Sequence, residues 1–162
     1  MTSNDAIKLA EGEYIALLDH DDLLHKHALF FVAKTIIENN KPNLIYTDED
    51  KYSVLEGRHM PHFKSDFNED LFYFSNYVSH LGVYKKSIID EIGGFRAGFE
   101  GSQDYDLALR VIANSKKDRI IHIPIVLYHW RVHSQSTAAF GSQKSYTTVS
   151  YTHLTLPTNA CV

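Results

Sequence analysis

The sequence has few of the residues that define several classes of protein. It contains a single cysteine, Cys161, beside the C-terminus of 162 residues. Neither a disulfide framework nor a four-cysteine zinc site can be built from it, and a lone cysteine fits a reducing compartment. The longest apolar stretches, at residues 14–18 and 120–128, are far too short to span a bilayer. No charged-then-apolar leader follows Met1, so nothing in the sequence suggests secretion.

Basic residues are also scarce. The chain has 16 Lys and Arg against 20 Asp and Glu, a formal net charge of −4, and no Lys/Arg-rich run. Proteins that bind nucleic acid carry a basic patch or stripe, so we predict no nucleic-acid partner. With 44% hydrophobic and 22% charged residues, the chain suits one ordinary domain.

We assign residues 1–140 to this domain and predict that residues 141–162 are a disordered tail. From about residue 149 the tail resembles a translated sequencing adapter, so it is left out of the fold prediction.

Short apolar runs alternate with segments of helical periodicity, which favours an α/β fold. Strands are predicted at residues 14–18, 44–47, 78–84 and 120–128, with Pro124 at an edge or a bend. Helices are predicted at residues 1–11, after Asp22 as N-cap, at 86–92 before Gly93 and Gly94, and from the cap Ser102 to about Asn114. Residues 51–76 form a long connection with a short hairpin. The uninterrupted run 14–18 predicts a strand buried on both faces.

Asp19, Asp21 and Asp22 follow the first of these strands directly. In open α/β sheets, ligands gather outside the carboxyl ends of the strands. If strand geometry persists, Asp19 and Asp21 project to one side, where their mutual repulsion favours a cation. Mg²⁺ or Mn²⁺ bridging a diphosphate suits such a pair. The alternative is that these acids only cap and solvate the next helix.

Two further acidic segments are less specific. Residues 48–50 (Asp-Glu-Asp) follow the second strand and are either another acidic site or a solvated turn. Asp104 lies in the first turn of a helix, where the dipole favours an ionised carboxylate that could act as a general base. An acid at this position can equally be a routine helix-stabilising residue.

Residues 128–133 place two imidazoles, an indole and a guanidinium in six positions after a strand. A histidine can complete an oxygen-rich metal site, Arg131 can neutralise a diphosphate, and Trp130 offers a face to a sugar ring. The alternative puts Trp130 in the core and the other side chains on the surface.

Taken together, residues 10–22, 93–96 with 103–110, and 127–138 resemble the family 2 glycosyltransferases of GT-A fold, of the bacterial type that builds cell-surface polysaccharides. The resemblance covers about residues 4–138. It implies a mixed, Rossmann-like sheet flanked by helices, and a chain that lacks the first strands of the family's fold. A sheet without these strands leaves open edges, so we expect this chain alone to be poorly soluble and inactive.

The resemblance also implies roles for individual residues. Asp19 would contact the nucleotide ribose or the metal, Asp21 would ligate the metal, and Asp104 would be the general base. His133 would be a further metal ligand, with His129 as the alternative. Gly94, Phe95, Gln103 and Trp130 would border the sugar and acceptor pocket, although the family often has Glu where this chain has Gln103.

The implied reaction is an inverting sugar transfer from a nucleotide-diphosphate sugar to a glycan or lipid-linked glycan acceptor, with Mn²⁺ or Mg²⁺. It would take place in the cytoplasm, at the inner face of the membrane, with the full-length protein associated peripherally. Two alternatives remain at this point: a metal-dependent phosphohydrolase and a non-catalytic nucleotide-sugar binding module.

Overall fold

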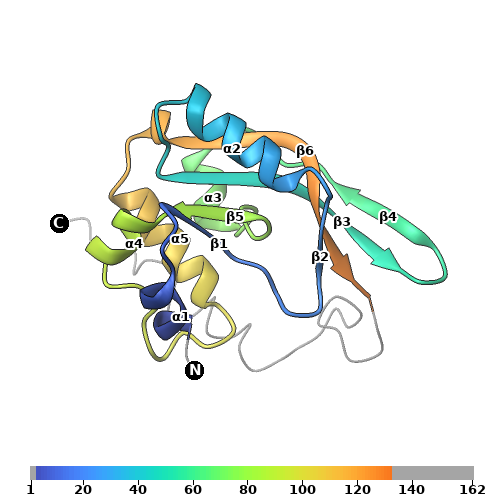
Figure 1. Ribbon diagram of the computed structural model, residues 1–162, viewed down its shortest axis with the longest axis horizontal. Helices are drawn as coiled ribbons and strands as arrows, with labels where there is room; N and C mark the ends of the chain where they lie inside the picture. Colours follow the sequence, from blue (N-terminus) through green and yellow to red (C-terminus); the bar gives the residue numbers. More distant parts are fainter. Residues whose placement is uncertain (1–2, 133–162) are drawn as a thin grey trace.

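The computed structural model describes residues 3–132, whose strands form one curled mixed sheet flanked by helices (Figure 1). The helices are α1 (Ser3–Leu9), α2 (Ala28–Glu38), α3 (Glu69–Phe74), α4 (Lys86–Glu91), α5 (Gln103–Ala113) and the short 3-10 helix η1 (Lys117–Arg119). The strands are β1 (Tyr14–Ala16), β2 (Leu23–Leu24), β3 (Leu44–Ser53), β4 (Gly57–His62), β5 (Gly82–Lys85) and β6 (Ile120–Arg131).

The strand order is β1-β5-β3-β6-β2, and β4 forms a hairpin with β3. β3 and β6 pair in parallel, while the other pairs are antiparallel. The α/β class and the mixed sheet predicted from the sequence are therefore confirmed.

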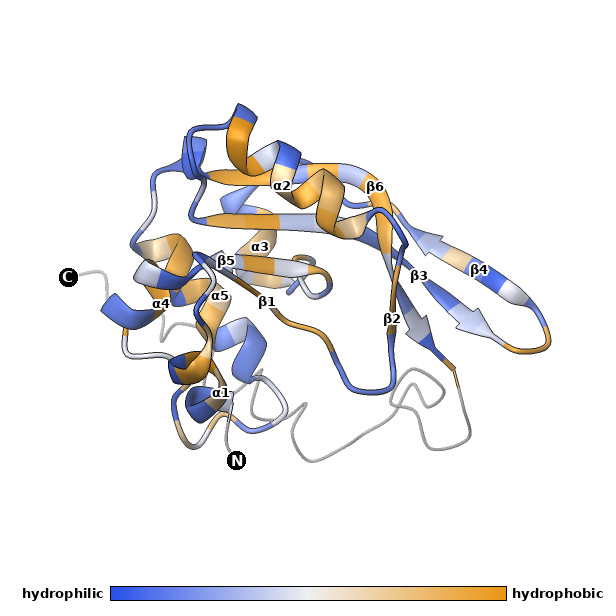
Figure 2. Cartoon of the chain, in the orientation of Figure 1, coloured by the Kyte–Doolittle hydropathy of each residue, from blue (hydrophilic) through white to orange (hydrophobic). Residues whose placement is uncertain are grey.

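The sheet separates two hydrophobic clusters because successive side chains of a strand point to opposite faces. Leu44 and Tyr46 of β3 pack with α1, α3, α4 and α5 on one face. Ile45, between them, packs with α2 on the other. Figure 2 shows the hydrophobic parts of β3, β5 and β6 between these helices, whereas the projecting β3–β4 hairpin is mostly hydrophilic.

Pro124 lies inside one continuous strand, β6. Thr47 is opposite Ile123, but the next residue, Asp48, is opposite Val126, so Pro124 and Ile125 form a bulge. Proline cannot donate to a strand ladder, and a bulge removes that requirement. The predicted bend is confirmed at this position.

Two local predictions are wrong. Residues 14–18 were expected to be a strand buried on both faces. Instead, β1 ends at Ala16 and lies at one end of the strand order, and Leu18 is 49% exposed. Among the described strands β1 pairs only with β5, so one of its edges has no neighbouring strand, and its residues are only partly buried or exposed. Asp22 is not a helix cap either: β2 follows it, and α2 begins only at Ala28, with His27 at the N-cap position.

The remaining helix predictions are confirmed to within about two residues. α4 ends before Gly93 and Gly94, which adopt φ values of 80° and 71° that glycine tolerates best. α5 has Ser102 at its N-cap and Asn114 at its C-cap. Residues 51–76 contain the expected hairpin, β3–β4, and also α3.

Several predictions lie beyond the described residues: the boundary at residue 140, the tail 141–162 and the metal ligand His133. Within residues 3–132, no helix has the length and apolar character needed to cross a membrane.

Candidate active site

Asp19 and Asp104, far apart in the sequence, line one cavity of about 290 Å³. Asp19 follows β1, and Asp104 lies in the first turn of α5. Phe95 and Gln103 line the same cavity, as does His80 from the segment before β5. The rest of its wall comes from α1, β1 and the residues that follow each: Ser3, Ala6, Ile7, Ala10, Ile15, Ala16, Leu17 and Leu18. The fold thus brings together four of the residues that the sequence singled out.

The acidic segment after β1 is a turn and not an extended strand. The Leu17 N–H still donates to the Gly82 carbonyl at 3.0 Å, but the Asp22 N–H then donates back to the Asp19 carbonyl at 3.2 Å. Strand alternation therefore does not place Asp19 and Asp21 on one side, and that part of the sequence argument is wrong. Asp19 lines the cavity, whereas Asp21 is not among its lining residues and lies 3.8 Å from His20.

Asp22 anchors the turn to β6. Its Oδ2 accepts a 2.6 Å hydrogen bond from the Tyr128 hydroxyl, and its Oδ1 accepts one of 2.8 Å from the Arg131 N–H. The Tyr128 oxygen in turn accepts from the Asp19 N–H at 3.3 Å. Burial first, and then the hydrogen bond to Asp22, raises the pKa of the Tyr128 hydroxyl far above its usual value. It therefore remains a donor at physiological pH.

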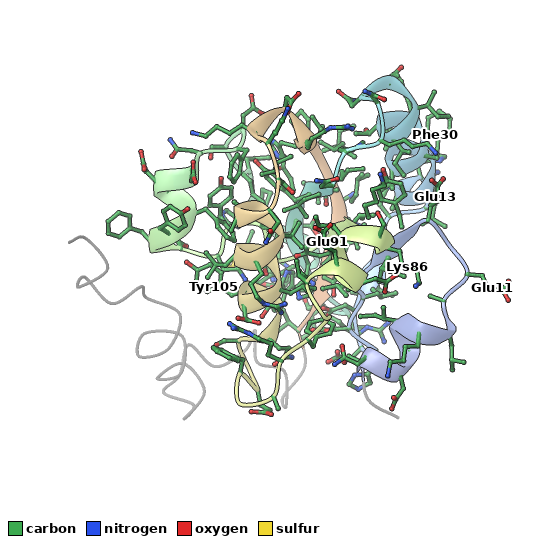
Figure 3. All side chains as sticks on the ribbon, turned by 90° about the vertical axis from the view of Figure 1, so that its left-hand side faces the viewer. Glu11, Glu13, Phe30, Lys86, Glu91 and Tyr105 are labelled. Carbon is green, nitrogen blue, oxygen red and sulfur yellow. The ribbon has the colours of Figure 1, made fainter. Side chains whose placement is uncertain are left out.

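Asp104 is held by a residue from outside its own helix. The side-chain amide of Asn76 donates a 2.9 Å hydrogen bond to Asp104 Oδ2. The start of α5 also favours the ionised carboxylate through the unpaired N–H groups of its first turn. α5 is fixed against α3 by Tyr105, whose hydroxyl donates to the Phe72 carbonyl at 2.7 Å (Figure 3).

His80 lines the cavity, and the sequence analysis missed it. Its Nε2 lies 3.7 Å from Asp19 Oδ2, and its side chain is 9% exposed. The ring stacks on Tyr128, with centroids 4.7 Å apart, and meets the edge of Trp130 at 4.9 Å. A single histidine in a predicted strand gave no local signal, because its partners lie in distant segments.

The Gly94–Phe95 turn is fixed from two sides. Asn4 accepts from the Phe95 N–H and donates to the Phe95 carbonyl, both at 2.8 Å. Arg110 of α5 donates to the Gly94 carbonyl at 2.7 Å and is ion-paired with the buried Asp106. This bracing sets Phe95 in the cavity wall.

Trp130 and Arg131 do not join this cavity. Trp130 lines a separate hollow of about 470 Å³, together with Glu49, Asp50, Lys51, Met60, Pro61 and His62. The Arg131 side chain is exposed, and its backbone N–H donates to Asp22. Phe95 and Trp130 thus line different hollows, and their shared role at the sugar and acceptor pocket stays a prediction. His80 lies between the two regions, since it lines the first cavity and touches Trp130.

Residues 48–50 form neither a turn nor an exposed acidic site, because they lie inside β3 with their side chains buried. Asp48 pairs with His122 at 2.9 Å, Glu49 with Lys64 at 3.0 Å, and Asp50 with both Arg58 and His129. Buried acids are tolerated when they are paired in this way. His129, the alternative metal ligand, is engaged by Asp50 at 2.5 Å through Nδ1.

Residues 3–132 contain no group of three or more His, Cys, Asp or Glu side chains arranged to hold a metal. Mg²⁺ commonly takes only one or two carboxylates from the protein and completes its shell with phosphates and water. Carboxylates such as those of Asp19 and Asp21 supply oxygen ligands of this kind, and a bound diphosphate would supply others.

Comparison with known proteins identifies the class. No protein-family model matches the chain. It is 51% identical over 89% of its length to the uncharacterised protein y4gI of Sinorhizobium fredii, of which the match spans 16%. It is 34% identical over 86% of its length to the O-antigen biosynthesis protein RfbC of Myxococcus xanthus, spanning 11% of that protein. Identity is 30% over 70% of the chain to the poly(ribitol-phosphate) β-N-acetylglucosaminyltransferase TarP of Staphylococcus aureus, spanning 36%.

The fold agrees with these matches. A crystal structure of S. aureus TarS residues 1–349 in complex with UDP-GlcNAc covers 90% of the chain at a TM-score of 0.65 and 20% identity. The alignment spans 43% of that TarS chain. The homologues of this chain include glycosyltransferases, and the chain has the GT-A fold of TarS. It spans well under half the length of the curated relatives compared above.

Proposed function

We propose that the protein containing this chain transfers a sugar from a nucleotide-diphosphate sugar to a hydroxyl of a glycan or lipid-linked glycan. The observation that carries the proposal is the convergence of Asp19 and Asp104 on one cavity. The first is the acid expected at the donor nucleotide, and the second is the expected base. Relatives named for O-antigen biosynthesis and for N-acetylglucosaminyl transfer, and the TarS complex with UDP-GlcNAc, support this reading.

In the proposed reaction, Asp104 takes the proton of the acceptor hydroxyl as that oxygen attacks the anomeric carbon. Attack in line with the departing diphosphate inverts the anomeric centre. Gln103 and Phe95 line the cavity and would border the sugar there, with Gly94 next to Phe95 in the chain. Trp130 borders the more distant part of the acceptor, because it lines the neighbouring hollow.

Asp19 and Asp21 would hold the diphosphate through Mn²⁺ or Mg²⁺, with His133 as a further ligand and Arg131 as a counter-charge. When bound, the metal offsets the negative charge that develops on the leaving diphosphate. Asp19 lies at the cavity wall and is 60% exposed, so its carboxylate is accessible to a ligand.

We further propose that this chain works as part of a longer catalytic domain, in the cytoplasm and associated peripherally with the inner face of the membrane. The edge of β1 that lacks a neighbour among the described strands supports the first part, as does the length of the relatives. TarS, with the same fold, matches over 43% of its chain only.

The test is Asp104→Asn in the full-length protein. Sugar transfer should fall by at least about 100-fold, the range of a lost general base, while binding of UDP is retained. Glu91→Gln, an exposed acid on α4, is the matched control and should leave both unchanged (Figure 3). Equal transfer by Asp104→Asn would refute the base assignment. A wild-type protein that binds UDP but transfers nothing would favour a binding module instead.

A further inference from the structure

The segment between α3 and β5, residues 75–81, contacts both acids of the candidate site. Asn76 donates to Asp104 Oδ2 at 2.9 Å, and His80 Nε2 lies 3.7 Å from Asp19 Oδ2. The two acids come from distant parts of the chain, yet their neighbours here are four residues apart. One short segment is therefore placed to set the relative position of both carboxylates.

The Asn76 side chain is fixed at both ends of its amide. Its nitrogen donates to Asp104, and its oxygen accepts from the Ser79 N–H at 3.3 Å. Because both groups are used, the amide cannot turn without losing a hydrogen bond. The Asn76 amide contacts the Oδ2 atom of Asp104.

The His80 ring is fixed by packing. It stacks on Tyr128 with an interplanar angle of 13° and meets Trp130 edge-on. This leaves rotation of the ring little room, with Nε2 toward Asp19. The buried Nδ1 has no hydrogen-bond partner among residues 3–132.

The buried ammonium group of Lys64 links the backbone of this segment to β3. The Lys64 ammonium donates to the carbonyls of Val78 and His80, at 2.9 and 2.6 Å, as well as to Glu49. Glu49 also accepts from the His80 N–H at 3.2 Å. The Leu81 N–H donates to Thr47 Oγ1 at 3.3 Å. Glu49 of β3 thereby supports the segment, although it is not among the residues that line the cavity.

We propose that residues 76–80 act as a positioning segment, in which Asn76 orients Asp104 for proton transfer and His80 orients Asp19 for the donor nucleotide. The inference rests on the proposed function. It divides that function between two residues with separable kinetic signatures: loss of Asn76 changes the rate of the chemical step, and loss of His80 changes donor binding.

The test uses Asn76→Ala and His80→Phe in the full-length protein. Asn76→Ala should lower kcat by about 10–100-fold, as supporting residues commonly do, with the donor KM within about twofold. Asn76→Ser, which keeps a hydroxyl donor, should recover part of kcat. His80→Phe keeps the stacking but removes the nitrogen, and should raise the donor KM and the Kd for UDP about 10-fold with little change in kcat. His80→Gln should recover part of that affinity.

Asn68→Ala is the matched control. Asn68 caps α3 through the Leu71 N–H at 3.0 Å and does not contact either acid. It should lower Tm without changing kcat or KM. If Asn76→Ala and His80→Phe behave in the same way, or if each changes kcat and KM together, the positioning roles are overturned.

A measurement independent of turnover separates this inference from the proposed function. In the NMR spectrum, the Asn76 side-chain amide signals should move on Asp104→Ala and stay in place on Glu91→Gln. If the amide signals move but the wild-type protein transfers no sugar, the function is refuted and the contact is supported. Measurable transfer with no response would refute the contact and leave the function standing.

Discussion

The ammonium group of Lys64 lies 3.0 Å from Oε2 of Glu49, and the Lys64 side chain is fully buried. Burial lowers the pKa of Lys64, while the Glu49 carboxylate acts in the opposite direction. Two further acceptors, the carbonyls of Val78 and His80, complete the shell of the ammonium. The pair therefore joins β3 to the segment that carries two residues of the site.

Breaking this pair should destabilise the protein strongly. Lys64→Met leaves the Glu49 carboxylate buried without its cation, and we expect a loss of about 3–5 kcal/mol in the free energy of unfolding. The double variant Lys64→Met/Glu49→Gln should regain part of that loss. Urea unfolding measures the free energy of unfolding of both variants. If that of Lys64→Met lay within about 1 kcal/mol of the wild-type value, the tightly buried pair would be contradicted.

Asp22 should stabilise the end of β6 and not α2. Asp22→Ala removes the acceptor of both Tyr128 and the Arg131 N–H, so we expect a loss of about 1–3 kcal/mol. Amide hydrogen exchange should accelerate at Arg131 and leave the first turn of α2 unchanged. Faster exchange at Ala28 with no change at Arg131 would restore the capping role predicted from the sequence.

Two adjacent glycines provide a matched pair. Both Gly93 and Gly94 have positive φ, but a Cβ on Gly93 meets no atom within 4 Å, whereas one on Gly94 would lie 2.6 Å from Asn4 Oδ1. Gly93→Ala should cost only the backbone strain, about 1 kcal/mol. Gly94→Ala should cost clearly more, because Asn4 must move and release Phe95. Equal losses on thermal unfolding would mean that Asn4 does not clamp this turn.

Buried tyrosines should limit stability at high pH. Burial is the main cause that raises the pKa of the Tyr46, Tyr84 and Tyr128 hydroxyls far above 10.0. The contribution of these buried hydroxyls to the free energy of unfolding is complete below pH 10, which is about the pKa of tyrosine in the unfolded chain. It is lost progressively as the pH rises above that value. Each should remove about 1.4 kcal/mol of unfolding free energy per pH unit in that range. Exposed tyrosines such as Tyr73 ionise first, so a second rise in tyrosinate absorbance should accompany the loss of circular dichroism. Ionisation of all tyrosines before unfolding would contradict the burial of these three.

Local patterns predicted those parts of the fold that depend on neighbours in sequence. Glycines after α4 and the proline of β6 impose backbone conformations by themselves, and α5 shows its periodicity within a few turns. The strand at 14–18 was misjudged because burial depends on which elements cover it. Its apolar run is the same whether or not a neighbour lies alongside.

The site was predictable only where a local pattern or a motif marked a residue. Asp19 was singled out after a strand and Asp104 at a helix start, the resemblance implied their roles, and both line the cavity. Asn76 and His80 have no local signature, since their partners come from the turn after β1 and from α5. Residues 48–50 were read as either an acidic site or a solvated turn because the side chains that pair with them, Lys64, His122 and His129, lie on other segments.

The central claim is that Asp19 and Asp104 belong to one donor site, and amide hydrogen exchange of the full-length protein tests it most directly. Nucleotide-diphosphate sugars with Mn²⁺ would be screened, and exchange would be measured with the donor that binds. The account predicts slower exchange at residues 15–19 and 101–106 together, with residues 58–62, beside the Trp130 hollow, unchanged. Protection confined to residues 58–62, or to only one of the two acidic segments, would contradict it.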